Sequence, residues 1–395
     1  MKLSVVIVSY NVKFYIEQCI KSILRSNVDF SYDIWVVDNV SSDDSVSYLK
    51  VRFPEVHFIV NKENVGFSRA NNQAIAVSRS EYVLLLNPDT IVGEHVLSEC
   101  VHFMDAHPQA GATGVAMLKD DGGFAWESRR GLPTPFTAFC KMSGLCALFP
   151  KSRLFGRYYM RYLDENQVNE IEVISGAFNM LRRSVLNKVG FLDEDFFMYG
   201  EDIDLSYRIL KGGYHNYYLP VQILHYKGES TKKSSFRYVH VFYDAMLIFF
   251  NKHYRDSHKF LGWLVRLAVV VRGVLDYCKN QKEKLSGLMW VKRTVIPTRI
   301  LCLGHASALK EMENIASHNH LKCIFYECDE KHNPQGHLEF VQKGTKFDYV
   351  VYDVESYSME TMLRLLHDGE ISCGAHLGVY HRSCRCIITH KDIWR

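Results

Sequence analysis

Apolar runs and amphipathic stretches alternate along the first hundred residues of the chain. Mostly apolar runs of strand length, typical of strands that are buried on both faces, occur at 3–9, 33–38, 56–60 and 82–86. Helices are predicted between them, the first with Ile16, Ile20, Ile23 and Leu24 on its apolar face. This order predicts an α/β fold with a mostly parallel, Rossmann-like sheet and helices on both faces.

The pattern becomes less regular after a helix near 94–107 and a strand at 112–117. Gly, Pro and aromatic residues predict a loop region at 119–167, suited to contacts with an acceptor. A strand is then expected at 172–180, with small residues at 175–177 that would let a ligand or backbone approach closely. A helix near 183–189 follows, and two short strands are expected at 214–219 and 223–226, on either side of Pro220.

Two apolar, aromatic and basic helices are predicted at 236–254 and 260–277. Arg266 and Arg272 argue against a transmembrane segment, because crossing would carry both charges through hydrocarbon. An amphipathic helix lying in the membrane interface fits this pattern, with lysines near an anionic leaflet. Burial of the helix against the rest of the protein remains an alternative.

The α/β pattern restarts after Pro297. Strands are predicted at 299–304, 322–327, 347–354 and 374–380, with helices at 308–318 and 359–367. We therefore expect a catalytic domain at 1–235, an amphipathic helical segment at 236–297 and a small Rossmann-like α/β domain at 298–395. The turn at 304–307 lacks the glycines of a dinucleotide fingerprint. A scaffold or docking role is therefore favoured for the last domain over nucleotide binding.

Composition narrows the class of protein. The 395 residues are 47% hydrophobic and 23% charged, with a net charge of +3, so neither disorder nor a broad nucleic-acid-binding surface is expected. An odd number of cysteines, 11, without a signal peptide before the first strand favours a reducing cytoplasm. Cys384 and Cys386 lie near another cysteine and several histidines, but their spacing is not that of a zinc knuckle.

Polar residues end three of the predicted strands. They are Ser9-Tyr10-Asn11, Asp38-Asn39 and Asn87-Pro88-Asp89. Ligands of open α/β sheets gather beyond the carboxyl ends of the strands, so these residues predict a binding crevice with Asp89 as the first site candidate. Capping of turns and helices is the alternative reading for Asn39, Ser41 and Ser42.

A second cluster of acidic residues follows a stretch with aromatic residues further along the chain. Glu201, Asp202 and Asp204 open a predicted helix directly after Phe197-Met198-Tyr199-Gly200. Helix capping favours acids at this position but explains one of them rather than a cluster. His225 ends a strand before a Gly/Ser loop, where a histidine is either structural or a ligand.

Taken together, the chain resembles the family 2 glycosyltransferases with the type A fold, and among them rhamnosyltransferase-like enzymes of bacterial surface polysaccharide assembly. The resemblance covers roughly residues 3–235 and does not extend to the last domain. The residues that carry it stand in the order of the family: Val8-Ser9-Tyr10-Asn11, Val36-Val37-Asp38-Asn39, Asn64-Val65-Gly66-Phe67, Asn71-Asn72, Leu86-Asn87-Pro88-Asp89, Ser175-Gly176-Ala177, Phe197 to Leu205, and His225 to Ser230.

The resemblance implies a role for each part. Asp38 would accept a hydrogen bond from the nucleotide base, and the other donor-site residues would be Ser9, Tyr10, Asn39, Asn64, Gly66, Arg69, Asn87 and Asp89. Only Asp89 remains as a charged metal ligand from its strand, since Asn87 replaces the first acid of the family's Asp-x-Asp pattern. Mg²⁺ suits one carboxylate plus phosphates, whereas Mn²⁺ would accept His225 more readily as a further ligand. Asp202 would be the general base of an inverting transfer, with Glu201 as runner-up.

The implied donor is a nucleotide sugar, linked to deoxythymidine diphosphate or uridine diphosphate, with rhamnose a candidate sugar. The implied acceptor is a glycan or a polyprenyl-diphosphate-linked glycan, which would place the protein at the inner face of the cytoplasmic membrane. Two alternatives stay open. Nucleotidyl transfer would require a glycine-rich, basic loop after the first strand, which Tyr10-Asn11-Val12-Lys13 does not supply. A non-catalytic scaffold of an assembly complex would not need the acids at positions 38, 89 and 202.

Overall fold

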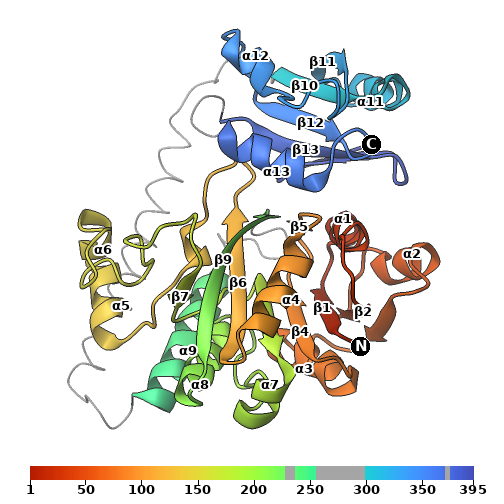
Figure 1. Cartoon of the computed structure of the whole chain (residues 1–395). Coiled ribbons are helices and arrows are strands. Elements are labelled where there is room, and N and C mark those ends of the chain that lie inside the picture. The colour runs from red at the N-terminus through yellow and green to blue at the C-terminus, as the bar shows by residue number, and fades with distance from the viewer. Residues whose placement is uncertain (227–235, 255–298, 370–373) are drawn as a thin grey trace.

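The structure is a computed structural model, and it describes residues 1–226, 236–254, 299–369 and 374–395. A nine-stranded and a six-stranded sheet organise these residues (Figure 1). The larger sheet contains β1 (Leu3–Ser9), β2 (Tyr32–Asp38), β3 (His57–Val60), β4 (Tyr82–Leu86), β5 (Thr90–Val92), β6 (Ala110–Leu118), β7 (Asn169–Ile171), β8 (Phe178–Arg182) and β9 (His215–His225). The smaller contains β10 (Arg299–Gly304), β11 (Lys322–Glu327), β12 (Tyr349–Asp353), β13 (His376–His381), β14 (Cys386–Ile388) and β15 (Ile393–Trp394).

The helices lie around these sheets. Those of the first part are α1 (Lys13–Leu24), α2 (Ser45–Arg52), α3 (Phe67–Val77), α4 (Val96–Ala106), the short 3₁₀ helix Trp126–Ser128, α5 (Pro135–Met142), α6 (Leu145–Leu148), α7 (Arg183–Val189), α8 (Glu201–Lys211) and α9 (Phe236–His253). Those of the second part are α11 (Ala306–His318), α12 (Leu338–Gln342) and α13 (Met359–Asp368).

The larger sheet has the order β3-β2-β1-β4-β8-β6-β9-β5, and β7 pairs with β9. The pairs β2·β3, β1·β2 and β1·β4 are parallel, so the carboxyl ends of β1, β2 and β4 share one edge, as the sequence predicts. Strands β4 and β6 both pair antiparallel with β8. The predicted α/β fold with a mostly parallel sheet is confirmed. Its two apolar faces form separate clusters, one around Leu84 and Leu86 and the other around Val83 and Leu85.

Two predicted strand boundaries are wrong, and each error has a local cause. Of the expected strand at 172–180 only the last three residues are extended, as the start of β8, because residues 172–177 form the connection from β7, which ends at Ile171. The two strands expected around Pro220 form one continuous strand, β9. A shift in register between Leu219 and Gln222 against β6 accommodates the proline, which lacks a backbone N–H.

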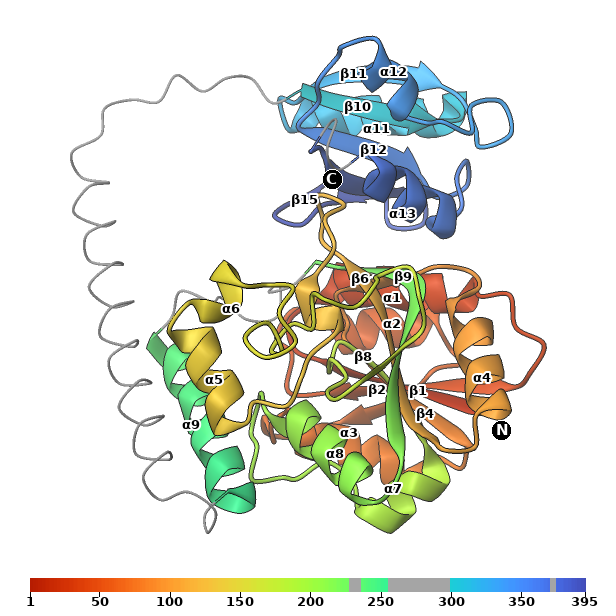
Figure 2. The same ribbon diagram turned by 60° about the vertical axis from the view of Figure 1, so that its left-hand side comes forward.

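The C-terminal α/β pattern is confirmed as a sheet of order β11-β10-β12-β13-β14-β15. Helix α13 contacts β5 and β9 of the larger sheet, and one apolar cluster includes side chains from both parts, among them Leu97 and Leu363. Figure 2 shows the smaller sheet above the larger one, with α13 on the side that faces it. The C-terminal unit is therefore packed on the edge that carries β5 and β9.

Helix α9 confirms the first of the two predicted apolar helices, and it packs against the larger unit. Ala245 and Phe249 are buried with Phe196, and Lys252 and His253 both contact Asp204 of α8. The second predicted helix, 260–277, lies outside the described residues. Within the part of the chain that the structure describes, no helix is both long and apolar enough to span a bilayer.

Candidate active site

A pocket of about 110 Å³ opens at the carboxyl ends of β1, β2 and β4. The side chains and backbone that line it are Val8, Tyr10, Asn39, Asn64, Gly66, Phe67, Asn87, Pro88, Phe197 and Met198. Five of the residues predicted to bind the donor therefore lie around one cavity. They come from different strand ends, which converge because the strands are parallel.

Asp38 is buried at the end of β2, beside Asn39 of this pocket. Its Oδ2 accepts a hydrogen bond of 2.9 Å from the backbone N–H of Ser41. Its Oδ1 is also buried, and none of the described residues donates a hydrogen bond to it. A buried carboxylate oxygen without a donor is costly, so this oxygen is suited to accept an N–H from a bound ligand. Ser9, which ends β1, is buried next to it in the sheet register.

The turn at Asn64–Gly66 forms another wall of the pocket. Gly66 has φ of +85°, and a Cβ at this position would lie 2.8 Å from both the ring and the carbonyl oxygen of Phe197. Only glycine fits this conformation and this contact. The N–H of Phe67 donates a 2.7 Å hydrogen bond to the same carbonyl, which fixes the loop before α8 against the turn.

Asp89 and His225 face each other across paired strands. Thr90 of β5 pairs with His225 of β9, and His225 Nε2 lies 3.4 Å from Asp89 Oδ1 and 3.3 Å from Asn87 Nδ2. The Asp89 side chain is 2% exposed and that of His225 is 13% exposed. A carboxylate and an imidazole at this separation fit a divalent ion that also binds phosphate oxygens, with the imidazole favouring Mn²⁺ over Mg²⁺.

Asp202 is held by the loop that divides β7 from β8. Its Oδ2 accepts a 3.1 Å hydrogen bond from the N–H of Gly176 and one from the Arg130 guanidinium. Ala177, the next residue, accepts a 3.0 Å hydrogen bond through its carbonyl from the N–H of Asn87. One short loop thus connects the strand end that leads to Asp89 with the carboxylate of Asp202.

Glu201 precedes Asp202 but has a different environment. Its side chain is buried, and Oε2 has no hydrogen-bond partner among the described residues. Burial, followed by the charge of Asp202, raises the pKa of Glu201 to about 8. Glu201 is therefore mostly protonated at neutral pH, whereas a general base must be ionised. This makes Glu201 a poorer base than Asp202.

Two further residues near the site differ from what the sequence predicts. Arg69 forms an exposed ion pair with Glu194 and does not line the pocket. Arg130, which sequence reasoning did not single out, binds both Asp202 and the carbonyl of Ile174. It stands in the irregular region where no periodic pattern could mark it. Its position in Glu-Ser-Arg-Arg-Gly, a basic pair in an aromatic loop, was the one available signal.

Residues 4–190 match the family model described as glycosyl transferase family 2. The chain carries a family 2 glycosyltransferase domain. We refer below to the larger sheet and its helices as the glycosyltransferase domain, and to residues 299–395 as the C-terminal domain.

The chain is also similar to characterised proteins. An N-acetylglucosaminyl-diphospho-decaprenol L-rhamnosyltransferase of Mycobacterium tuberculosis is 26% identical over 69% of this chain and 92% of its own length. The rhamnosyltransferase WbbL of Escherichia coli is 24% identical over 60% of this chain and 91% of its own. Among solved structures, the mannosyltransferase PcManGT of Pyrobaculum calidifontis aligns with a TM-score of 0.44 at 15% identity, covering 73% of this chain and 81% of its own.

Proposed function

We propose that this glycosyltransferase transfers a sugar from a nucleotide diphosphate to a hydroxyl group of a glycan or lipid-linked glycan, with inversion at the anomeric carbon. Rhamnose is the favoured sugar, in line with the names of the two rhamnosyltransferase relatives. A deoxythymidine or uridine diphosphate is the favoured carrier, because the buried Oδ1 of Asp38 is suited to accept the N–H of such a base. Polyprenyl-diphosphate-linked glycan is the favoured acceptor class, which would bring the protein to the inner face of the cytoplasmic membrane.

The observation that carries this proposal is the hydrogen-bonded loop Ser175–Ala177. It contacts both Asp202 and the strand end before Asp89. A diphosphate held near Asp89 and an acceptor hydroxyl near Asp202 would therefore lie within reach of the same short loop. In the direct displacement that we propose, the acceptor attacks the anomeric carbon from the face opposite the leaving group.

Each part of the site has a role in the proposed reaction. Asp38 accepts the N–H of a uracil or thymine base, and Tyr10 and Asn64 flank the nucleoside in the pocket. Asp89 and His225 would hold Mg²⁺ or Mn²⁺, whose bound charge would neutralise the departing diphosphate. Asp202 removes the proton from the acceptor hydroxyl. Arg130 and the Gly176 N–H hold one oxygen of Asp202 in place.

Substitution Asp202→Asn tests the assignment of the base. Asparagine has nearly the same shape and can still accept hydrogen bonds from Arg130 and Gly176, but it cannot take up a proton at neutral pH. We expect donor binding to be retained while turnover falls by at least about a hundredfold, the usual contribution of a general base. Release of nucleoside diphosphate from a panel of nucleotide sugars, with Mg²⁺ or Mn²⁺, measures turnover. Calorimetry measures donor binding.

The matched control for this experiment is Asp195→Asn. Asp195 belongs to the same acidic segment, is exposed, and is absent from the lining of the pocket. Its substitution should leave turnover near the wild-type value. Near-normal turnover of Asp202→Asn would remove Asp202 from the mechanism and leave the base unassigned.

A further inference from the structure

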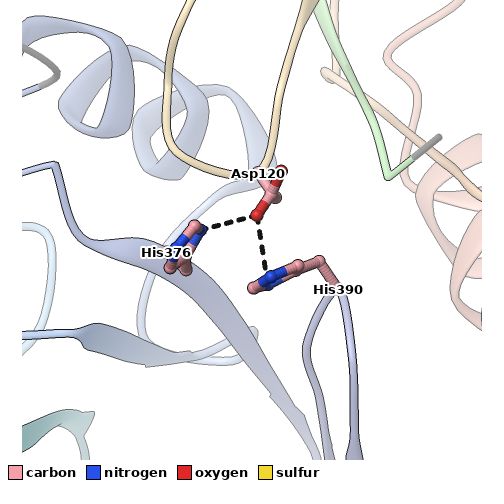
Figure 3. Close-up of side chains that lie close together, drawn as sticks. All are labelled: Asp120, His376 and His390. Carbon is pink, nitrogen blue, oxygen red and sulfur yellow. Dashed lines mark hydrogen bonds and ion pairs between the residues drawn. The ribbon is translucent and has the colours of Figure 1, made fainter. Parts of the chain in front are cut away.

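Three side chains from separate parts of the chain meet where the two domains touch (Figure 3). Asp120 lies in the turn after β6, His376 begins β13, and His390 follows β14. Nδ1 of His376 is 2.6 Å and Nδ1 of His390 is 3.1 Å from the same oxygen, Oδ2 of Asp120. Their potential ligand atoms all lie within 4.8 Å of one another, a closeness that no other group of three such residues reaches in the described ranges.

Hydrogen bonds alone do not account for this arrangement. His376 is hydrogen-bonded to Asp120, but Nδ1 of His390 is buried and has no hydrogen-bond partner among the described residues. The two imidazole rings lie with their centroids 4.2 Å apart, and Tyr349 packs against both rings at 5.5 Å and 5.8 Å. A buried polar nitrogen that is held in this way, facing a carboxylate without bonding to it, requires another partner.

We propose that Asp120, His376 and His390 bind one divalent transition-metal ion, with Zn²⁺ as the preferred ion, which joins the C-terminal domain to the glycosyltransferase domain. Zn²⁺ binds imidazole nitrogen and carboxylate oxygen at about 2.0–2.2 Å, so that neighbouring ligand atoms of a tetrahedral site lie about 3.3 Å apart. The nitrogens now lie 2.6 and 3.1 Å from the oxygen, so these two separations need to grow by less than about 1 Å to reach that value. Water takes the fourth position. Two imidazoles make Mg²⁺ and Ca²⁺ poor occupants.

The ion would complete a junction that the backbone already forms. The carbonyl of Asp120 accepts a 2.9 Å hydrogen bond from the N–H of Leu377, and the carbonyl of Gly122 lies 3.0 Å from Nδ1 of His367. A Cβ on Gly122 would lie 2.2 Å from the carbonyl oxygen of Leu366, so the turn fits tightly against α13. The ion would therefore fix the turn at the end of β6. Strand β6 pairs with β9, and β9 ends at His225.

Zinc binding by the full-length protein tests the proposal. The protein is stripped with a chelator, saturated with Mg²⁺ to occupy the donor site, and titrated with Zn²⁺ in a calorimeter, while its metal content is measured after dialysis. We expect about one equivalent of zinc and a rise in Tm on zinc addition, since a ligand that binds only the folded state stabilises it. His376→Asn and His390→Asn keep a polar side chain near Asp120 but remove a ligand. Each should weaken zinc binding at least tenfold and abolish most of the rise in Tm.

His95→Gln is the matched control. His95 and Glu360 form another histidine–carboxylate contact between the domains, at 2.6 Å, but no third ligand joins them among the described residues. Its zinc affinity and zinc-induced rise in Tm should equal those of the wild type. The proposal is overturned if the wild type binds no zinc, or if His376→Asn and His390→Asn bind it as the wild type does. It is also overturned if Asp89→Asn abolishes the zinc equivalent, since the ion would then occupy the donor site.

Discussion

Two neighbouring carboxyl groups at the start of α8 differ because their surroundings differ. Asp202 meets an N–H and a guanidinium, which stabilise negative charge, whereas Glu201 is enclosed without a donor for one of its oxygens among the described residues. A negative charge on Glu201 therefore costs free energy, whereas a negative charge on Asp202 is compensated by its donors. The base of the proposed reaction is therefore selected by local solvation, which residue type alone does not reveal.

The raised pKa of Glu201 predicts a pH dependence of stability. The ordinary pKa is 4.5, and in the folded chain it is about 8, so between these values the folded state binds a proton that the unfolded state has lost. The free energy of unfolding should therefore fall as the pH rises from about 5 to about 8. Glu201→Gln removes the titration and should lose less stability over this interval, as measured by urea unfolding at pH 5.5 and 8.5. Glu99→Gln, at an exposed position, should lose as much stability between these pH values as the wild type does. If Glu201→Gln also lost as much stability as the wild type, the raised pKa of Glu201 would be contradicted.

At the scale of the elements, the site depends on places where regular structure is interrupted. The Asn64–Gly66 turn contacts the loop before α8 through a backbone hydrogen bond and close packing, and the loop 175–177 contacts the end of β4 and the first turn of α8. The parallel strands only bring these loops to one edge. The loops then determine the shape of the pocket.

Gly66→Ala should therefore damage both stability and donor binding. A residue with a Cβ pays about 1–3 kcal/mol for the extended, positive-φ conformation of Gly66 (φ +85°, ψ 170°), and the contact with Phe197 adds to this cost. We expect a lower urea midpoint and donor binding at least several-fold weaker by calorimetry. Gly213→Ala is a sharp control, because Gly213 has the same φ of +85° but no atom within 4 Å of the position that a Cβ would take. It should lose stability through backbone strain alone, and equal donor affinity for both variants would exclude a role of the turn in the pocket.

Helices and strands could be predicted from the sequence where apolar residues recur with a clear helical or strand period. They were harder to predict where contacts between residues far apart in the sequence determine the backbone conformation. The strands that end at Ser9, Asp38 and Leu86 follow from mostly apolar runs, and the proposed donor-site residues follow from their polar ends. The loop in place of a strand at 172–177 includes the hydrogen bond from Gly176 to Asp202, a contact that no local pattern encodes. The same holds for His376 and His390, which approach Asp120 only because the two domains pack together.

For the whole molecule, the junction between the domains is built from polar contacts as well as apolar ones. Glu94, just before α4, accepts hydrogen bonds of 2.8 Å from the N–H groups of Met359 and Glu360 in the first turn of α13. A carboxylate from one domain thus caps a helix of the other, where it also meets the favourable end of the helix dipole. This arrangement fixes α13 against β5 and β9.

Glu94→Ala should lower the free energy of unfolding by about 1–2 kcal/mol, the usual cost of losing a helix cap. The loss should appear in the urea midpoint and in faster proteolysis of the C-terminal domain. Glu99→Ala provides the comparison, since Glu99 is an exposed residue of α4 for which the structure gives no side-chain contact to α13. An unchanged midpoint for Glu94→Ala would show that the domains hold together without this cap.

The pairing of β5 with β9 also bears on how the protein is made. Asn87 and His225, whose side chains lie 3.3 Å apart, are separated by 138 positions in the chain. During synthesis, the N-terminal strands leave the ribosome well before the segment that completes this corner of the site. A nascent chain therefore acquires the pocket walls at the ends of β1, β2 and β4 early, and the wall at Phe197 and Met198 and the proposed metal-binding histidine late, so an arrested or prematurely terminated product would be folded in part but catalytically silent.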